Sequence, residues 1–132
     1  MSFLIDTNIV SELARREPDP SVLAWAETVN SVALSVVTVE EIHYGLFFRP
    51  NPRISAWFET FLGDCLILPI SLEISRRAGK LRGNLAASGQ VRTQADMLIA
   101  ATAHIHSLPL ATRNTRDFKS CGIEVFDPFG QR

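Results

Sequence analysis

Short apolar runs alternate with stretches of helical spacing along the whole chain. The runs that predict strands lie at residues 3–5, 32–37, 66–70, 108–112 and 123–126. The run at 32–37 is apolar and rich in β-branched residues, which predicts a strand covered on both faces. Helices are expected at about residues 9–16, 21–29, 38–49, 54–62, 71–87 and 93–106. Strands alternating with helices predict an α/β domain with a mostly parallel sheet.

Length and composition fit one ordinary domain. A chain of 132 residues can bury roughly two-thirds of its unfolded surface. Its apolar runs are far shorter than the ~20 residues that span a bilayer, so we expect no membrane segment. The N-terminus carries no basic leader, and two cysteines form no spaced framework, which favours a reducing cytoplasm.

The net charge of -1 argues against a broad basic surface for nucleic acid. Metal neutralisation of four acidic residues would change this balance to 13 basic against 10 of the 14 acidic residues. A surface that faces a phosphate chain then need not repel it.

Four acids, Asp6, Glu41, Asp96 and Asp117, lie just past a predicted strand or in the first turn of the helix that follows one. An open parallel sheet gathers such side chains into one crevice outside the carboxyl ends of its strands. Clustered carboxylates repel one another unless protons or a cation neutralise them, and hard oxygen ligands suit Mg²⁺ or Mn²⁺. The pattern therefore predicts a cation site.

Each acid taken singly has a simpler interpretation. Asp6 could be a helix N-cap, Asp117 a turn residue, and Glu41 and Asp96 the third residues of capping boxes that Thr38 and Thr93 open. Capping does not explain why all four fall on one edge of the predicted sheet.

The remaining acids are scattered, and we expect them to be solvated: Glu12, Glu17, Asp19, Glu27, Glu59, Asp64, Glu73, Glu124 and Asp127. Glu40 is rotated by about 100° from Glu41 on a helix, so only one of the two can face the crevice, and we assign that position to Glu41.

Four segments, at residues 3–8 (FLIDTN), 35–45 (SVVTVEEIHYG), 95–103 (ADMLIAATA) and 111–118 (ATRNTRDF), cover most of the chain in order. Together they resemble the PIN-domain ribonucleases, and within them the VapC-like toxins of type II toxin-antitoxin modules. The resemblance implies a single domain over residues 1–132, a three-layer α/β/α sandwich around a mostly parallel five-stranded sheet.

The resemblance also implies a set of site residues. Asp6, Glu41 and Asp96 match the family's acidic triad that holds Mg²⁺ or Mn²⁺, while the fourth position matches either Asn114 or Asp117.

Hydrolysis of RNA needs a nucleophilic hydroxide and a stabiliser of charge on the phosphate, and bound divalent ions supply both. We expect Asp6 and Asp96 to bind the metal directly, and Glu41 and Asp117 to act through water.

Polar and basic neighbours of these acids are candidates for binding substrate. Thr7, Asn8 and Asn114 could hydrogen-bond the scissile phosphate, although each is also an ordinary turn former. Arg113 and Arg116 could neutralise phosphates.

Other chemistries are less well supported. The histidines lack metal-ligand spacing, the cysteines lack that of a zinc site, and no phosphate loop or nucleophile elbow occurs. An aspartyl phosphatase typically has a second aspartate where this chain has Asn8. Two alternatives stay open: a PIN-type ribonuclease of RNA processing or decay without an antitoxin, and a non-catalytic regulatory partner with an acidic groove.

Two aromatic residues predict a protein–protein interface. Phe47 and Phe48 are adjacent, so they cannot both face inward from one helix. An exposed aromatic marks an interface. The toxin resemblance implies a homodimer and a cognate VapB-like antitoxin whose peptide lies in an apolar groove and reaches the acids with a basic side chain.

Overall fold

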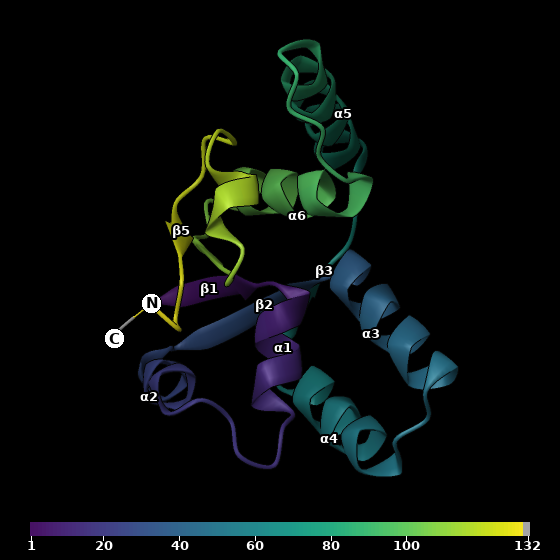
Figure 1. Ribbon diagram of the computed structural model, residues 1–132, viewed down its shortest axis with the longest axis vertical. Coiled ribbons are helices and arrows are strands. Elements are labelled where there is room, and N and C mark those ends of the chain that lie inside the picture. The colour runs from purple at the N-terminus through teal and green to yellow at the C-terminus, as the bar shows by residue number, and fades with distance from the viewer. Residues whose placement is uncertain (131–132) are drawn as a thin grey trace.

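The computed structural model describes residues 1–130 and shows one five-stranded sheet (Figure 1). The strands are β1 (Ser2–Ile5), β2 (Ser31–Ser35), β3 (Leu66–Leu68), β4 (Leu110–Ala111) and β5 (Val125–Phe126). Their order is β3-β2-β1-β4-β5, and every neighbouring pair is parallel. The predicted five-stranded parallel sheet is confirmed.

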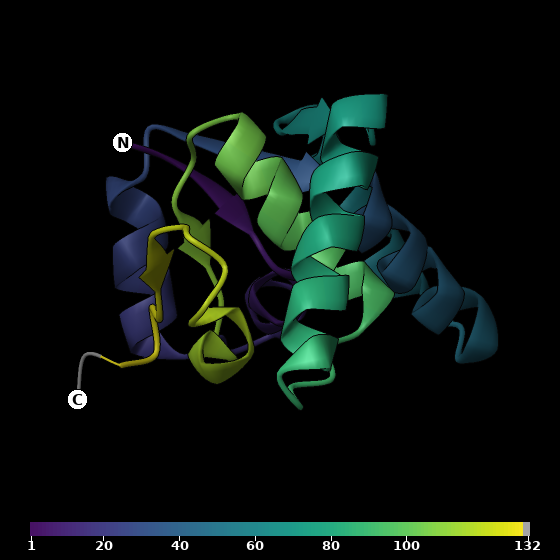
Figure 2. The same ribbon diagram turned by 90° about the horizontal axis from the view of Figure 1, so that it is seen from above.

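Helices cover both faces of this sheet, as Figures 1 and 2 show. They are α1 (Thr7–Leu13), α2 (Pro20–Thr28), α3 (Val36–Phe48), α4 (Pro52–Gly63), α5 (Leu72–Ala87) and α6 (Gln94–Ile105), with a short 3₁₀ turn, η1 (Thr115–Phe118). Within residues 1–130 none of the helices has the length and apolarity needed to cross a bilayer.

Successive side chains of β1 point to opposite faces of the sheet, which separates two hydrophobic cores. Phe3 and Ile5 pack with α1, α2 and α4, for example against Phe58. Leu4 packs on the other face with α5 and α6, for example against Met97. These two cores give the three-layer α/β/α arrangement that the sequence predicts.

The central strand β1 sets the position of the candidate site. From β1 the chain moves to β2 and β3 on one side, and it returns later to β4 and β5 on the other. The strand order therefore reverses between β1 and β4, and such a switch point is where open α/β sheets bind ligands. The backbone bond from Asp6 N–H to the Ala111 carbonyl, 3.0 Å, places the residues that follow these two strands side by side.

The predicted boundary between β2 and α3 was wrong. Val36 and Val37 are helical, because the Ser35 hydroxyl accepts a hydrogen bond from the Val37 N–H at 3.0 Å and caps the helix there. Thr38 is therefore not the N-cap but a buried residue of the first turn, and within residues 1–130 its hydroxyl oxygen has no hydrogen-bond partner. The expected capping box of Thr38 and Glu41 does not form.

Candidate active site

Asp6 follows β1 and has a nearly buried carboxylate. It caps α1 by accepting a hydrogen bond from the Thr7 N–H on Oδ1 at 2.7 Å. The expected N-cap role is therefore confirmed, but it accounts for only one of the two carboxylate oxygens. Its Oδ2 also accepts from Asn8 Nδ2 at 3.2 Å and from Thr112 Oγ1 at 2.8 Å. A buried charge costs free energy unless hydrogen bonds compensate it, and here three donors do so.

Thr112 was not identified from the sequence, although it directly follows β4. Its side chain is fully buried, and its Oγ1 accepts the Asn114 N–H at 3.0 Å. Because a hydroxyl carries one proton, the accepted bond from Asn114 directs that proton to Asp6. Thr112 thus links the Asp6 carboxylate to the loop that carries Asn114.

Glu41 lies in the second turn of α3 and is half-buried, whereas Glu40 is exposed. The Thr7 hydroxyl donates to Glu41 Oε1 at 2.6 Å, so one residue of α1 contacts both Asp6 and Glu41. The assignment of Glu41 to this crevice agrees with that geometry.

Asp96 lies in the first turn of α6, where its N–H donates to the Thr93 hydroxyl at 3.1 Å, as the predicted cap requires. Burial raises the pKa of its carboxyl above the ordinary value, and the negative charges of Asp6, Asp117 and Glu41 raise the pKa further. The Thr93 hydrogen bond acts in the opposite direction. The other three predicted acids therefore lie within electrostatic range of Asp96.

Asn114 and Asp117, the two candidates for the fourth site residue, are hydrogen-bonded to each other. The Asn114 side-chain amide donates to Asp117 Oδ2, and the Asn114 N–H binds Thr112. Thr112 also donates to Asp6, so a chain of hydrogen bonds connects Asn114 and Asp117 to the Asp6 carboxylate.

Within residues 1–130 no Lys or Arg side chain forms an ion pair with these acids. Among the described residues the ion pairs are Arg15 with Glu12 and His43 with Glu59, and neither involves the four acids. The charges at this edge repel one another without compensation from Lys or Arg, which is the condition under which a cation binds favourably.

Oxygen donors fit a magnesium-like ion here. Across residues 1–130 no three or more His, Cys, Asp or Glu side chains are close enough to hold an ion by themselves. Mg²⁺ commonly keeps several waters and takes one or two protein carboxylates, so a complete protein cage is not required. Of roughly four acceptor positions on the Asp6 carboxylate, the three bonds above leave one, on Oδ1.

A comparison with protein families matches residues 3–123 to the PIN domain. The chain belongs to the PIN domain family. It is 37% identical over 135 residues to the VapC ribonuclease Y4jK of Sinorhizobium fredii, with 96% of each chain covered. It is 32% identical to the toxin FitB of Neisseria gonorrhoeae, covering 96% of this chain and 97% of that one.

A solved toxin-antitoxin complex from Klebsiella pneumoniae contains a similar chain, with a TM-score of 0.76, 28% identity and coverage of 96% of this chain and 97% of that chain. These similarities confirm the VapC-like resemblance of this PIN domain.

Basic residues of this PIN domain lie beside the acidic edge. The Arg113 guanidinium stacks over the Phe129 ring at 4.2 Å from its centroid, and the Arg113 N–H donates to Asn8 Oδ1 at 3.2 Å. Arg116 is exposed on η1. Arg92, which the sequence analysis did not single out, donates through Nε to the Asp117 carbonyl at 3.0 Å.

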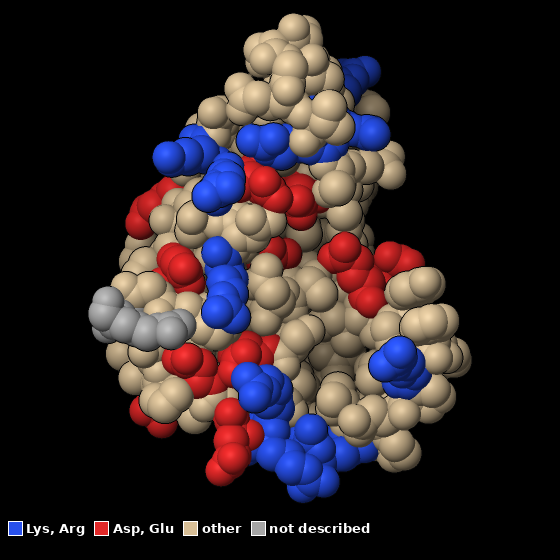
Figure 3. Space-filling view, in the orientation of Figure 1, with Lys and Arg blue, Asp and Glu red and all other residues tan. Residues whose placement is uncertain are grey.

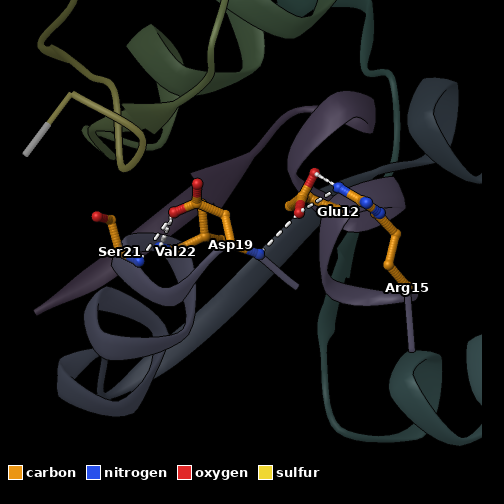
Figure 4. A network of polar contacts seen from close by, with 5 residues as sticks. All are labelled: Glu12, Arg15, Asp19, Ser21 and Val22. Carbon is orange, nitrogen blue, oxygen red and sulfur yellow. Dashed lines mark hydrogen bonds and ion pairs between the residues drawn. The ribbon is translucent and has the colours of Figure 1, made fainter. Parts of the chain in front are cut away.

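Glu12 and Asp19 were expected to be solvated, and for Glu12 this was wrong. Glu12 is buried at the far end of α1, where it accepts from Arg15 and from the Asp19 N–H at 2.8 Å (Figure 4). Asp19 is partly buried and caps α2 through the Ser21 and Val22 N–H groups. Glu12 is therefore a structural acid that connects α1 to α2, away from the site.

The cysteines and histidines do not lie among the candidate site residues, in agreement with their lack of metal-ligand spacing. Cys65 and Cys121 are free thiols, and burial raises the pKa of Cys65 to about 11. His104 and His106 are exposed, and His43 contacts Glu59 and the edge of Phe58.

We expect Asp96→Asn to stabilise the metal-free protein at neutral pH, because the substitution removes a carboxylate that burial and three acidic neighbours disfavour in its charged form. A raised pKa in the folded state means that the charged carboxylate lowers the free energy of unfolding above that pKa. This loss of stability disappears at pH values below the ordinary aspartate pKa, where the carboxyl is protonated in both the folded and the unfolded protein. Thermal melts with EDTA at several pH values measure this. A Tm gain that is equal at neutral and acidic pH would contradict the repulsion among these acids.

Proposed function

We propose that this PIN domain is a metal-dependent endoribonuclease and the toxin component of a type II toxin-antitoxin system. The observation that carries the proposal is the convergence of four acids, without basic partners among residues 1–130, at the switch point between β1 and β4. The relatives named VapC ribonuclease and toxin FitB support the substrate class and the biological role.

Asp6 and Asp96 would hold Mg²⁺ or Mn²⁺ directly. When bound, a divalent ion supplies a hydroxide nucleophile and stabilises charge on the phosphate. Glu41 and Asp117 would orient water around it. The Thr7 hydroxyl keeps Glu41 directed toward this edge, and the bonds from Thr112 and Asn8 fix the Asp6 carboxylate before substrate arrives.

Substrate would contact the polar groups above the acids. Asn114 lies on the loop after β4, and its amide is held against Asp117. Asn8 bridges Asp6 and the Arg113 backbone. Either amide could turn toward a phosphate oxygen without moving the backbone, because each is a side-chain group on an anchored turn.

We predict that Asp6→Asn and Asp96→Asn each lower Mn²⁺-dependent RNA cleavage by at least ~100-fold, because each removes one of two direct ligands. Glu40→Gln is the matched control, since Glu40 is an exposed acid on α3 next to Glu41. Cleavage of a labelled single-stranded RNA, with and without EDTA, measures the effect. Wild-type rates in either aspartate variant, or equal losses in Glu40→Gln, would rule out this site.

A second prediction concerns the coupled pair on η1. We expect Asp117→Asn to raise the Mn²⁺ concentration needed for half-maximal cleavage by about 10-fold, since the substitution removes a negative charge from the site. Asn114→Ala should have a smaller effect on Mn²⁺ dependence and a larger one on KM for RNA. Mn²⁺ titrations at saturating RNA separate the two variants, and equal and negligible losses in both would leave Asp6, Glu41 and Asp96 as the complete acidic site.

An apolar groove leads away from the acids between α1, α3 and α4. Thr7 and Glu41 lie at one end, and the other lining residues are Ser11, Ala14, Ile42, Gly45, Leu46, Arg49, Asn51 and Ile54. We infer that the antitoxin peptide lies here and directs a basic side chain at Glu41 and Asp6, because this groove joins apolar surface to unpaired negative charge. The toxin-antitoxin complex of the Klebsiella relative supports such a partner.

Exposed aromatic and aliphatic side chains next to this groove suit the homodimer or the antitoxin. Phe47 and Phe48 are 85% and 70% exposed at the C-terminal end of α3, and Tyr44 stacks on Phe48 with 6.1 Å between ring centroids. The edge strand β3 exposes Leu66 and Ile67. Apolar groups of this size on the surface of one domain mark an interface.

We predict that Phe47→Ser with Phe48→Ser weakens self-association or antitoxin affinity by about 10-fold or more, because hot-spot aromatics dominate interfaces. Leu23→Ser on α2 is the matched control, as Leu23 is also an exposed apolar residue. Light scattering and titration with the antitoxin encoded beside the gene measure both interactions. A wild-type monomer at micromolar concentration, together with unchanged antitoxin affinity in the double variant, would exclude this surface.

A further inference from the structure

Arg92 lies between α5 and α6 and reaches the loop that carries Asp117. Its Nε–H donates to the Asp117 carbonyl at 3.0 Å. Its two terminal nitrogens donate to the Val91 carbonyl at 3.3 Å and to Gln90 Oε1 at 3.4 Å. Three hydrogen bonds therefore hold the guanidinium in one place beside the acidic edge.

Those bonds leave part of the guanidinium available. Arginine has five N–H donors, so two remain, one on each terminal nitrogen. Within residues 1–130 Arg92 has no ion pair, although Asp117 is its neighbour, because the Asp117 side chain binds Asn114 while its carbonyl binds Arg92. A fixed positive charge with two donors is thus left beside the site without a carboxylate partner.

A phosphate diester matches these donors. Its two free oxygens accept from the paired N–H groups of a guanidinium, which is why arginine predominates in phosphate recognition. Immobilising a mobile side chain on binding costs conformational entropy and so weakens the contact. The bond to the Asp117 carbonyl and two local bonds already orient Arg92, whereas Arg116 is exposed on η1 with no side-chain hydrogen bond found among residues 1–130.

Lys and Arg side chains also gather on this side of the molecule. Figure 3 shows them around α5, α6 and η1, next to a group of Asp and Glu side chains; a second basic group lies at the lower end of the molecule, below a mostly uncharged hollow. The acidic edge lies between a basic side and the apolar groove.

We propose that Arg92 binds a phosphate of the RNA strand next to the one that is cleaved, on the basic side of the acidic edge. This inference rests on the proposed ribonuclease function. With this assignment, the RNA phosphates contact the side of the site formed by α5, α6 and η1. The antitoxin occupies the groove on the other side, between α1, α3 and α4.

Arg92 could instead serve only to hold the Asp117 loop in place. A purely structural contact would lower Tm and Mn²⁺ affinity when lost, and it would leave the salt dependence of RNA binding unchanged. A phosphate contact changes that dependence, because each neutralised phosphate of a single strand contributes about 0.7 to the slope of log K against log salt.

The test measures binding of a labelled single-stranded RNA across a salt series in an Asp96→Asn background, and KM and kcat in the active protein. For Arg92→Gln we expect about 10-fold weaker RNA binding, a salt slope smaller by about 0.7 and a KM about 10-fold higher with kcat within ~2-fold. Arg92→Lys should retain the salt slope with partial affinity. Arg116→Gln should lose only about 2- to 3-fold, and Arg16→Gln, at the opposite end of α1 from Asp6, should match the parent.

Unchanged affinity and salt slope in Arg92→Gln, with or without a lower Tm, would overturn the phosphate contact. A greater loss in Arg116→Gln than in Arg92→Gln would overturn the argument from immobilisation. An inactive wild-type protein would overturn the ribonuclease proposal, and the binding series would still decide whether Arg92 contacts RNA.

Discussion

The nearly buried carboxylate of Asp6 is the constraint on which the rest of the site depends. Charge in that position is tolerable only with compensation, and within residues 1–130 the compensation comes from hydrogen-bond donors: the Thr7 N–H, the Asn8 amide and the Thr112 hydroxyl. A lysine or arginine in their place would pair with the charge. Neutral donors hold the carboxylate still without an ion pair, which is the arrangement that the proposed cation site requires.

The same bonds extend to the other acids. Thr7 contacts Asp6 through its N–H and Glu41 through its hydroxyl. Thr112 binds Asp6 and receives the Asn114 N–H, and Asn114 binds Asp117. Asp96 joins this group through space, by repulsion. Asp6, Glu41 and Asp117 therefore form one connected unit, and a change at Thr112 would disturb Asp117 although the two do not touch.

The sequence was informative where local chemistry decides the outcome. Apolar runs and helical spacing were sufficient for the parallel sheet. Strand ends were sufficient to predict acids within electrostatic range of Asp96, because the carboxyl ends of parallel strands share an edge. Val36 and Val37 were misassigned because β-branched residues favour strands, while the neighbouring Ser35 caps a helix. The hydrogen bond from the Val37 N–H to the Ser35 hydroxyl therefore outweighed the strand propensity of the two valines.

Long-range contacts were beyond the sequence pattern. Thr112 meets Asp6 across 106 positions, and Arg92 meets the Asp117 carbonyl across 25. Burial of Glu12 depends on the chain from Arg15 to Asp19 folding back over α1. Hydrophobic periodicity predicts which face of a helix or strand is apolar, but it does not predict which polar side chain from a distant part of the sequence will contact that element.

Stability and function oppose each other at this edge. Protein basic residues lie nearby, yet Arg92 turns its Nε to a carbonyl and Arg113 stacks on Phe129, so neither guanidinium forms an ion pair with the four acids. Each arrangement forgoes an ion pair that would relieve the repulsion among the acids, which adds to burial in raising the pKa of Asp96. Holding the cations apart from the anions leaves both groups free for the partners proposed above: a metal or an inhibitor's basic side chain for the carboxylates, and phosphate for the guanidinium groups. An inhibitor that neutralises the carboxylates would therefore compete with the metal and need not cover the basic side.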